Sequence, residues 1–472
     1  MRIRALPLLL AASACSMTPK LSLPAAPVAA AYPAADGVEA LPAWRSMFGD
    51  PRLQRLIELA LDSNRDLRIA ALHAEAARAQ VRIQHAQALP AINLDGGYTR
   101  QRQPASVAGA GVGLASGAGS GASGFEFGQF SAQAALTSFE IDLFGRLRAL
   151  DAAAFHRWLA SVAARRSVRL AVIGAVADAY WNERLADEQQ ALTRATLEDW
   201  RASLDITRRR HAAGQASGAD LAQAEGQVRQ AQADLVQRER EATQATNALT
   251  LAIGAPPPAD LPPPSPLAAQ PIRTGLAAGT PSDLLLRRPD IVQAEQELRA
   301  ANADVGAARA AFFPRISLTG AFGFASLALD HLFQGANRSW SYAPAISLPI
   351  FRGGELRGTL NLARLRTSIA VATYEKAIQT GFREVADGLA AQATYAAQLT
   401  GMDAATSQAE RRLQLADLGY RAGQTGRLEL LDAQRATYAA RQAALVARRE
   451  QLAAAAALFR ALGGDPETEG AR

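Results

Sequence analysis

The stretch AAFFPRISLTGAFG, residues 310–323, passes from a helical to an extended pattern at Pro314. The proline ring cannot continue a helical hydrogen-bond ladder, so a helix should end there. Beyond the proline, Ile316 and Leu318 alternate with the polar Ser317. A period of two with one apolar face is typical of a β-strand. We therefore expect a helix that leads directly into an amphipathic strand.

The same change occurs at Pro90, and both copies belong to a longer internal repeat. Such self-similarity at one fixed spacing is the mark of a repeated structural unit. The matching residues of the helix and strand are Asp66, Ala70, Val81, Pro90, Ile92 and Leu94, which recur as Asp290, Ala294, Val305, Pro314, Ile316 and Leu318. Farther along, Val176-Ala177-Asp178 recurs as Val385-Ala386-Asp387, Gly214-Gln215 as Gly423-Gln424, and Gly254 as Gly463. The chain is therefore a tandem duplication.

Each repeat is predicted to contain a helix, a strand pair, a very long helix and a return helix. No proline interrupts the chain between Pro104 and Pro256 or between Pro349 and Pro466. The helices expected from this pattern comprise residues 66–89, 145–212, 218–253 and 354–421. At ~1.5 Å per residue, the longest of them would each extend roughly 100 Å. Rods of that length have no core of their own and must pack laterally on other helices.

The predicted strands place apolar residues on one face and small or polar residues on the other. The apolar set comprises Ile92, Leu94 and Tyr98 in the first repeat and Trp340, Tyr342, Ile346 and Leu348 in the closing strand of the second. A barrel wall between lipid and water produces this pattern, and a half-buried soluble sheet would produce it too. After the N-terminal segment, no stretch reaches the roughly 20 consecutive apolar residues of a membrane-spanning helix. Any crossing of a bilayer should then use strands.

Four strands in one chain indicate an oligomer. About eight strands is the usual minimum for a closed barrel. An open sheet edge in hydrocarbon would leave backbone amides unpaired, at a cost of several kcal/mol each. We therefore expect several copies of the chain to complete one barrel.

Composition indicates a folded protein without an obvious catalytic centre. The 472 residues are 49% hydrophobic and 20% charged, which argues against wholesale disorder. The net charge is +6, but the arginines are spread along helical stretches rather than gathered in one block, so we expect no nucleic-acid partner. The histidines neither cluster nor show metal-ligand spacing, and no phosphate loop or nucleophile elbow occurs. We therefore expect no enzyme activity, no metal and no cofactor.

Cys15 is the only cysteine, and it follows Met-Arg-Ile-Arg and an apolar stretch at residues 5–12. The sequence Ala12-Ser13-Ala14-Cys15 resembles a lipoprotein box, which predicts cleavage before the cysteine. Its thiol would then carry a diacylglycerol and its freed amine a further acyl chain such as palmitate, and several acyl chains make a lasting anchor. Ser16 at the next position favours sorting to the outer membrane. The alternative is an ordinary signal peptide with an incidental cysteine.

Four separated motifs carry a family resemblance over nearly the whole chain. They are PSDLLLRRPDI at residues 281–291, AAFFPRISLTGAFG at 310–323, SLPIFRGG at 347–354 and YRAGQTGRLELLDAQR at 420–435. Together they resemble the lipoprotein branch, of NodT type, of the TolC-like outer-membrane efflux channels. The resemblance implies an α+β membrane protein that forms a homotrimer. Four strands from each protomer would build a twelve-stranded β-barrel above a twelve-helix periplasmic α-barrel, with a mixed equatorial belt.

The resemblance also implies partners and a function. A periplasmic adaptor and an inner-membrane transporter of RND type would join the channel in a tripartite pump. The channel would lie in the outer membrane of a Gram-negative bacterium, in contact with its lipid, and would conduct drugs and other toxic small molecules passively to the outside. It would thereby contribute to antibiotic resistance.

The repeat and its flanking segments define the expected domain organisation. We expect a signal peptide at 1–14, a lipid-anchored and equatorial segment at 15–63, the first repeat at 64–254, a proline-rich connector and equatorial belt at 255–287, the second repeat at 288–463 and a tail at 464–472. Plain flexible linkers are the alternative for the connector and the tail. The segment 105–124, almost entirely glycine, alanine and serine, is expected to be a mobile extracellular loop.

The second hairpin carries a candidate gate. Leu428, Asp432 and Arg435 stand at i, i+4 and i+7 and so share one helix face, with Glu429 beside them. The first hairpin holds Ala219, Gln223 and Gly226 at the matching positions, and Asp220 matches Glu429. The resemblance implies that this face constricts the periplasmic end and that Tyr420 tethers the second hairpin to the first. We expect Asp432 to pair with Arg435 or with a neighbouring protomer. An exposed turn with ordinary charge pairs is the alternative.

Other functions remain open at this point. Within the channel class, the alternative is an outer-membrane duct for type I protein secretion. A periplasmic adaptor or structural coiled-coil rod would explain the long helices and the anchor but not the amphipathic strands. The repeated Asp178 and Asp387 could suggest paired catalytic carboxylates, but helix packing or lumen charge explains two copies of one repeat position more simply.

Overall fold

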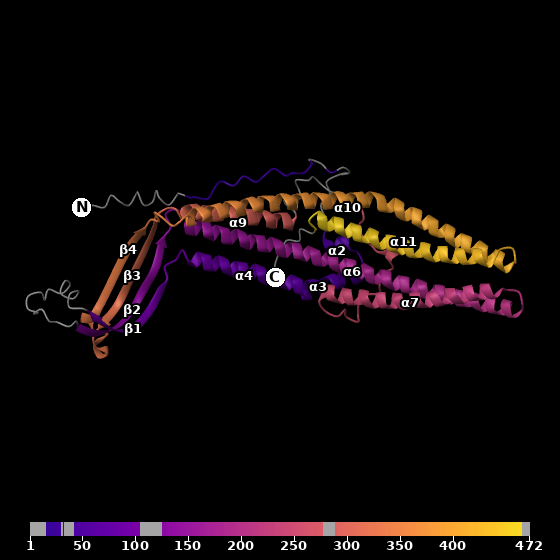
Figure 1. Cartoon of the computed structure of the whole chain (residues 1–472), viewed down its shortest axis with the longest axis horizontal. Helices are drawn as coiled ribbons and strands as arrows, with labels where there is room; N and C mark the ends of the chain where they lie inside the picture. Colours follow the sequence, from indigo (N-terminus) through magenta and orange to yellow (C-terminus); the bar gives the residue numbers. More distant parts are fainter. Residues whose placement is uncertain (1–15, 30–31, 33–41, 104–124, 277–287, 465–472) are drawn as a thin grey trace, which may run out of the picture. The chain divides into compact units, whose positions relative to one another are not determined.

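The structure is a computed structural model that describes residues 16–29, 32, 42–103, 125–276 and 288–464 (Figure 1). The described residues form two compact units. The sheet unit comprises segments within residues 1–23, 76–158 and 297–370, and the helical unit comprises segments within 24–75, 159–296 and 371–472. Each unit therefore takes residues from both repeats.

The sheet unit contains four antiparallel strands in the order β1-β2-β3-β4. They are β1 (Ile92–Gln103), β2 (Phe125–Ile141), β3 (Arg315–Ser326) and β4 (Arg338–Ser347), with short 3-10 turns η3 (Leu329–His331) and η4 (Gly335–Asn337) between the last two. The first repeat supplies β1 and β2, and the second supplies β3 and β4. The duplication is thus visible as two strand hairpins that pair with each other through β2 and β3.

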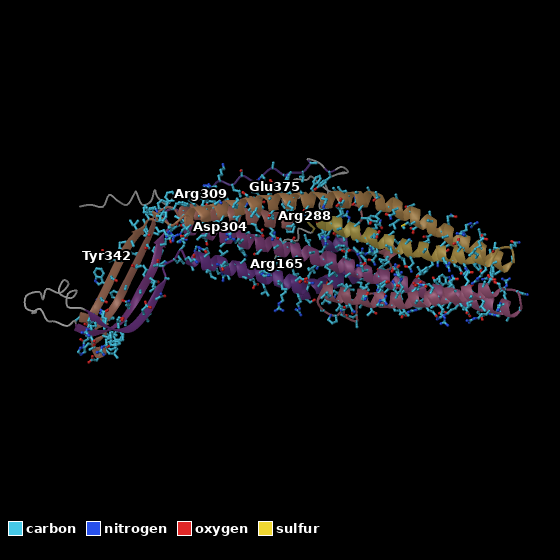
Figure 2. All side chains as sticks on the ribbon, in the orientation of Figure 1. Arg165, Arg288, Asp304, Arg309, Tyr342 and Glu375 are labelled. Atoms are coloured by element: carbon cyan, nitrogen blue, oxygen red, sulfur yellow. The ribbon has the colours of Figure 1, made fainter. Side chains whose placement is uncertain are left out.

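One face of this sheet is apolar over most of its length on all four strands, with charged residues such as Arg100 and Glu126 only toward one end, which confirms the predicted period of two. The register places Leu318 of β3 opposite Phe139 of β2 and Pro344 of β4. On the same face, Trp340 and Tyr342 of β4 stack with ring centroids 5.9 Å apart, and both side chains are exposed (Figure 2 labels Tyr342). The opposite face carries small and polar residues, among them Ser317, which lies opposite Glu140.

The helices follow the predicted pattern closely. They are α2 (Trp44–Met47), α3 (Pro51–Ser63), α4 (Arg65–Ala86), α6 (Arg146–Ala212), α7 (Gly218–Ile253), η2 (Leu267–Ala269), α9 (Pro289–Ala310), α10 (Glu355–Arg421) and α11 (Arg427–Ala461). The predicted long helices are confirmed, since α6 and α10 each contain 67 residues. Regular α-helix ends at Ala86 rather than Leu89, because the amides of residues 87–89 bond to carbonyls three residues back ahead of Pro90. Among the described helices, none is both long and apolar enough to cross a membrane.

The core of the helical unit gathers aromatic side chains from distant parts of the chain. Phe48, just after α2, packs its ring against Trp181 of α6 and Phe459 of α11, with centroids 6.1 and 5.9 Å away. Tyr180 of α6 donates a buried hydrogen bond of 2.8 Å to Asp50, the residue that caps α3. These contacts fix the N-terminal helices against the two long-helix hairpins.

The described part of the proline-rich connector is packed against this core. Phe48 and Ile272 form a β-bridge, and the Arg52 guanidinium donates to the Pro262 carbonyl at 2.9 Å. Leu267 is buried, and its amide donates to Glu188. The connector through Leu276 is therefore an ordered part of the helical unit. Residues 277–287 and most of the predicted tail lie outside the described residues, as does the predicted loop at 105–124.

Arg288 ties three helices together in the helical unit. Its side chain is 8% exposed and pairs with Asp290 of α9 at 2.6 Å and with Glu384 of α10 at 2.8 Å. It also donates to the Ala461 carbonyl at the end of α11. A buried arginine needs such partners because an uncompensated charge is costly away from water. This residue of the RRPDI motif thus has a structural role.

Charge on the apolar face of the sheet should disrupt assembly. We expect Leu318→Arg to cost roughly 2–4 kcal/mol near the middle of a bilayer, because arginine would enter hydrocarbon. Ser317→Arg, on the opposite face of the same strand, is the matched control and should be milder. The fraction of assembled oligomer recovered from membranes measures both. Equal losses from the two substitutions would contradict the proposed lipid-facing surface.

Candidate functional site

Two helical hairpins of the helical unit end in turns of the same design. In the first, α6 passes into α7 through Gly214, whose φ is +72°, and in the second, α10 passes into α11 through Gly423 at +73°. The amide that follows each glycine donates five residues back, from Gln215 to the Arg210 carbonyl and from Gln424 to the Gly419 carbonyl. This left-handed cap suits glycine and satisfies carbonyls left free by the helix end. The duplication therefore supplies two equivalent hairpin tips.

Each hairpin has its own apolar contacts near the tip. Trp200 and Leu204 of α6 pack against Val228 of α7, and Ala416 of α10 packs against Leu430 and Ala433 of α11. Cross-helix ion pairs follow along the second hairpin, namely Arg412–Asp432 at 2.6 Å, Arg441–Glu410 at 2.8 Å and Arg448–Asp403 at 2.8 Å. The second hairpin is thus held by small apolar contacts and a ladder of charges.

The predicted gate residues lie together at the start of α11. Leu428 is 71% exposed, and Glu429, Asp432 and Arg435 are exposed as well. Within one protomer, the expected Asp432–Arg435 pair is wrong, because Asp432 instead accepts from Arg412 of α10. The neighbouring antiparallel helix brings a guanidinium to the carboxylate across the hairpin. The role of this face as a gate stays a prediction.

Asp220 has a capping role in the first hairpin. Ser217 and Asp220 form a capping box, in which the serine hydroxyl accepts from the Asp220 amide and the carboxylate accepts from the Ser217 amide. Hydrogen bonds from the Ser217 side chain and backbone lower the pKa of Asp220, and the Arg427 charge lowers it further. The carboxylate therefore stays charged at neutral pH. The matching Glu429 follows Gly426, which offers no side-chain cap.

Tyr420 lies between two arginines that come from both hairpins. The Arg210 guanidinium of α6 is 4.7 Å from the ring centroid and that of Arg427 is 5.5 Å away. Arg427 is buried and donates to the Ser203 hydroxyl of α6 at 2.8 Å. Cation–π contacts of this kind contribute roughly 0.5–2 kcal/mol depending on exposure. Tyr420 and Arg427 thus contact α6 of the first hairpin from the second hairpin.

Arg427 was absent from the residues predicted for this site. The signal that could have identified it is the repeat itself, because Arg427 replaces Gly218 at the spacing that relates Gly423 to Gly214. A large cation in place of a glycine breaks the symmetry of the two tips. Arg412 carried no comparable signal, since its pairing with Asp432 depends on how α10 and α11 align.

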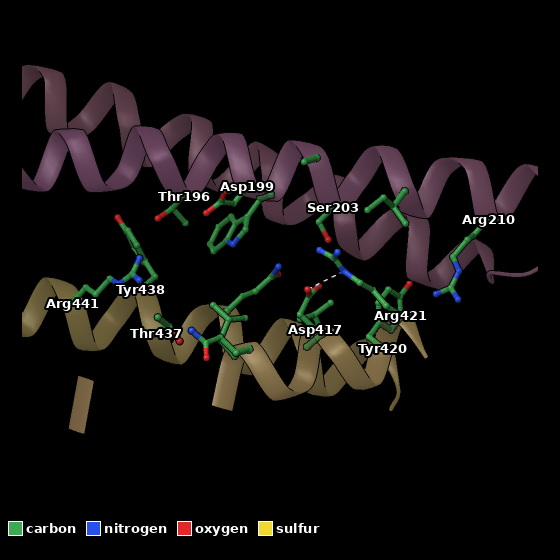
Figure 3. A pocket seen from close by; sticks show the side chains of 17 residues that line it. Thr196, Asp199, Ser203, Arg210, Asp417, Tyr420, Arg421, Thr437, Tyr438 and Arg441 are labelled. Atoms are coloured by element: carbon green, nitrogen blue, oxygen red, sulfur yellow. Dashed lines mark ion pairs between the residues drawn. The ribbon is translucent and has the colours of Figure 1, made fainter. Parts of the chain in front are cut away.

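A cavity of about 520 Å³ separates the hairpins beside these ties (Figure 3). Figure 3 shows Ser203 on α6 facing the Arg421 side chain of α10, which pairs with Asp417 at 2.9 Å. Deeper along the hairpins, the Tyr438 hydroxyl of α11 and the Thr193 hydroxyl of α6 share a hydrogen bond of 2.8 Å. Near their tips, the two hairpins therefore touch through polar ties and the Trp200–Tyr438 ring contact, with centroids 6.1 Å apart, around a hollow rather than through a continuous core.

The other candidate residues do not gather into one site. Asp178 of α6 lies 3.7 Å from Arg449, and burial raises the pKa of Asp178 against the charges of Arg449 and Arg460. Asp387 of α10 pairs with Arg383 on its own helix. Among the described residues, no group of three or more His, Cys, Asp or Glu side chains is placed to hold a metal ion. Cys15 lies outside the described residues.

The paired hairpins and the one-sided apolar sheet define a class of membrane exporter, and comparison with known proteins identifies it. The family described as outer membrane efflux protein matches residues 56–255 and 280–464. The chain therefore belongs to the outer membrane efflux protein family. It is 43% identical to the outer membrane protein OprJ of Pseudomonas aeruginosa over 98% of this chain and 95% of that protein. It is 42% identical to the probable efflux pump outer membrane protein TtgC of Pseudomonas putida, over 95% of this chain and 92% of that protein.

Solved structures agree with this assignment. A membrane protein from Pseudomonas aeruginosa superposes with a TM-score of 0.88 at 43% identity, covering 95% of this chain and 98% of that chain. The open state of the MtrE outer membrane channel of Neisseria gonorrhoeae gives 0.85 at 36% identity, with 95% and 98% covered. The fold is therefore that of TolC-like outer-membrane channels, and the chain is an outer-membrane component of an efflux system.

Removing charges at the tip of the second hairpin should open the channel. We expect Asp432→Ala and Arg412→Ala to raise single-channel conductance in planar bilayers by similar amounts, because each breaks the same cross-helix pair. Arg435→Ala should also raise it if three copies of this face meet on one axis. Gln223→Ala, at the position in the first hairpin that matches Asp432, is the control and should change conductance little.

Reversal potentials measured at matched salt separate gating from selectivity. Glu429→Gln should reduce preference for cations without a large change in conductance, since acidic rings attract cations whether or not helices part. If the Asp432, Arg412 and Arg435 variants all conduct like the parent, the second hairpin is not the gate, and this face is only a solvated turn.

Proposed function

We propose that the chain forms the outer-membrane exit duct of a tripartite efflux pump and conducts toxic small molecules passively to the outside. The observation that carries the proposal is a sheet with one apolar face on the same chain as two long helical hairpins, in a member of the outer membrane efflux protein family. The sheet suits a lipid-facing wall and the hairpins suit a tunnel that extends from it. No catalytic step is required of such a duct.

We propose a homotrimer, which would supply the partner strands that the four-stranded sheet lacks. Strands β1 and β4 lie at the two ends of the strand order, so each has one neighbour within the described sheet. Pairing β4 of one protomer with β1 of the next satisfies those edges, and three protomers give twelve strands, above the usual minimum of about eight. Twelve long or stacked helices would then surround one tunnel. Apolar side chains exposed on α4 and α10, such as Ile69, Leu72, Leu362 and Leu365, would be covered by neighbouring protomers.

The proposed partners are a periplasmic adaptor and an inner-membrane RND-type transporter. A passive duct has no energy source, so another component must load it and select its cargo. Relatives bear names that refer to toluene, solvent and antibiotic efflux pumps. We propose apolar solvents and drugs as the cargo class of this chain. Because these names refer to efflux, they favour small molecules rather than secreted proteins as the cargo of this chain.

The hairpin tips supply a gate that a partner can open. The ties at the described tips are Arg427–Ser203, Tyr420 between two arginines, and Arg412–Asp432. A partner that binds the tips and offers other contacts to these groups would separate the hairpins. The cavity beside the ties leaves little apolar contact to break.

We also propose that Cys15 anchors the mature chain through covalent lipid. The support is the signal-like segment before the only cysteine. Acyl chains contribute ~0.8 kcal/mol per buried CH₂, so three of them hold a protein in a membrane durably. The anchor would add to the membrane attachment that the sheet provides. It would act mainly while the protein is targeted to the outer membrane.

A deletion strain tests the proposed function. Loss of the gene should increase susceptibility to chemically varied solvents and antibiotics, and the intact chain should restore resistance. Leu318→Arg should fail to restore it, because the sheet would not assemble. Co-purification should recover an adaptor and a transporter. If the deletion strain keeps its susceptibility to every compound but secretes less of some protein, a secretion duct would be favoured.

Mass spectrometry of the purified protein tests the anchor. We expect the mature chain to begin at Cys15 and to carry three acyl chains. A chain that retains residues before Cys15, or an unmodified Cys15, would refute the lipoprotein proposal. Cys15→Ser should reduce abundance in the outer membrane more than conductance per assembled channel.

A further inference from the structure

Residues 16–23, within the described N-terminal segment 16–29, contact α9 in the sheet unit. The Asn302 side chain donates a hydrogen bond of 2.9 Å to the Pro19 carbonyl, and Asn302 is only 8% exposed. One turn farther along α9, Gly306 faces Thr18. We call residues 16–21 the strap. Its half-buried residues include Thr18 and Pro19.

Gly306 is required by the close approach of the strap. A Cβ at this position would lie 2.2 Å from the Thr18 hydroxyl and 2.8 Å from the Thr18 Cα. Real Cβ atoms do not approach backbone so closely, so any side chain would displace the strap. The helix therefore presents a gap at Gly306 and a hydrogen-bond donor at Asn302, one turn apart on one face.

The first repeat lacks this arrangement, although α4 is the counterpart of α9. At the spacing that relates Val81 to Val305, Asn302 corresponds to Arg78 and Gly306 to Arg82. Both arginines are exposed on α4, whereas Asn302 and Gly306 are buried on α9. Two arginines would block an extended segment by size. The difference between the repeats thus coincides with the place where the strap lies.

The remaining faces of α9 have other contacts. Val305 and Ala308 pack against Ala363 of α10, and Asp304 pairs with Arg157 of α6 (Figure 2 labels Asp304). Burial raises the pKa of Asp304, while Arg157 and Arg366 oppose the shift. The face with Asn302 and Gly306 is therefore the one that the strap covers.

We propose that Asn302 and Gly306 form a docking site for the strap and that this site sets where the N-terminal anchor enters the membrane. Thr18 lies beside Gly306 and Pro19 beside Asn302, so the strap, followed from Pro19 back toward residue 16, runs toward the end of α9 that leads into β3. Residue 15 is three positions before Thr18, which keeps it within ~11 Å of Thr18 by chain length alone. The docked strap holds the lipidated residue beside the membrane-facing sheet of its own protomer. This second clause rests on the proposed lipid anchor, and docking itself does not.

The chain offers a single-site assay for docking, because its only lysines are Lys20 and Lys376. Lys376 lies within α10, so a lysine-specific protease should cut the folded trimer first at Lys20, and only when the strap leaves α9. Cleavage of a transiently open segment follows the population of the open form. We expect slow cleavage at Lys20 in the intact protein. Gly306→Arg, which installs the residue of the first repeat, should accelerate it at least tenfold, and Asn302→Ala severalfold.

Arg82→Gly and Arg78→Ala on α4 are the matched controls and should leave the rate unchanged. Asn302→Ala keeps the test decisive if Gly306→Arg fails to assemble. Equal cleavage rates for the parent, Asn302→Ala and Gly306→Arg would overturn the docking site. So would parent cleavage as fast as that of a free peptide of residues 16–25.

A second arm separates docking from anchoring. In Cys15→Ser, protection of Lys20 should persist, since the contacts belong to Asn302 and Gly306. Parallax quenching by lipids labelled at different depths, with a fluorophore attached through Ser22→Cys in the acylated protein, should then report a fixed depth in the parent and a broad one in Gly306→Arg. Protection with equal depth profiles would refute the positioning role while leaving docking intact. Loss of protection in Cys15→Ser would show that lipid rather than α9 holds the strap.

Discussion

The unpaired edges of the four-stranded sheet constrain the rest of the molecule. One face of the sheet is apolar over most of its length on every strand, and β1 and β4 end the strand order. In hydrocarbon, each unpaired amide or carbonyl costs several kcal/mol, so those edges require partner strands. A second copy of the chain would supply a partner strand with the same apolar face. Helices of neighbouring protomers would then pack side by side. This packing would cover the long apolar side chains that α4 and α10 expose in one protomer.

Duplication supplies the frame, and departures from it supply specific functions. The two repeats share strand pairs, long helices of equal length and glycine turns with nearly equal φ. The two repeats differ at positions where only one of them makes a specific contact. Arg427 replaces a glycine and connects the hairpins, while Asn302 and Gly306 stand in place of arginines beneath the strap. Position in a repeat thus gives a physical criterion for function in a single sequence.

Most of the fold could be predicted because its determinants are local. Pro90 and Pro314 end helices by their own stereochemistry, and alternation such as Ile316-Ser317-Leu318 identifies a strand and its apolar face without knowledge of its neighbours. Contacts across helices could not be predicted in this way. Whether Asp432 meets Arg412 or Arg435 depends on the axial alignment of α10 and α11, to which many small alanine contacts contribute. Packing of the connector likewise depends on side chains hundreds of residues away.

The energetics of the hairpin tips suit a gate that a partner opens. Arg412 and Asp432 are 51% and 62% exposed, so their ion pair contributes about 0–1 kcal/mol rather than the larger value of a buried pair. The buried Arg427 adds a charged hydrogen bond of roughly 1.5–3 kcal/mol, and its Nε has no partner within the described structure, which lowers the cost of moving it. A few such ties in each protomer hold the tips without an apolar core between the hairpins. Binding energy of several kcal/mol from a partner protein is comparable to this total. A gate built on these ties would stay closed alone and would open on assembly without any chemical step.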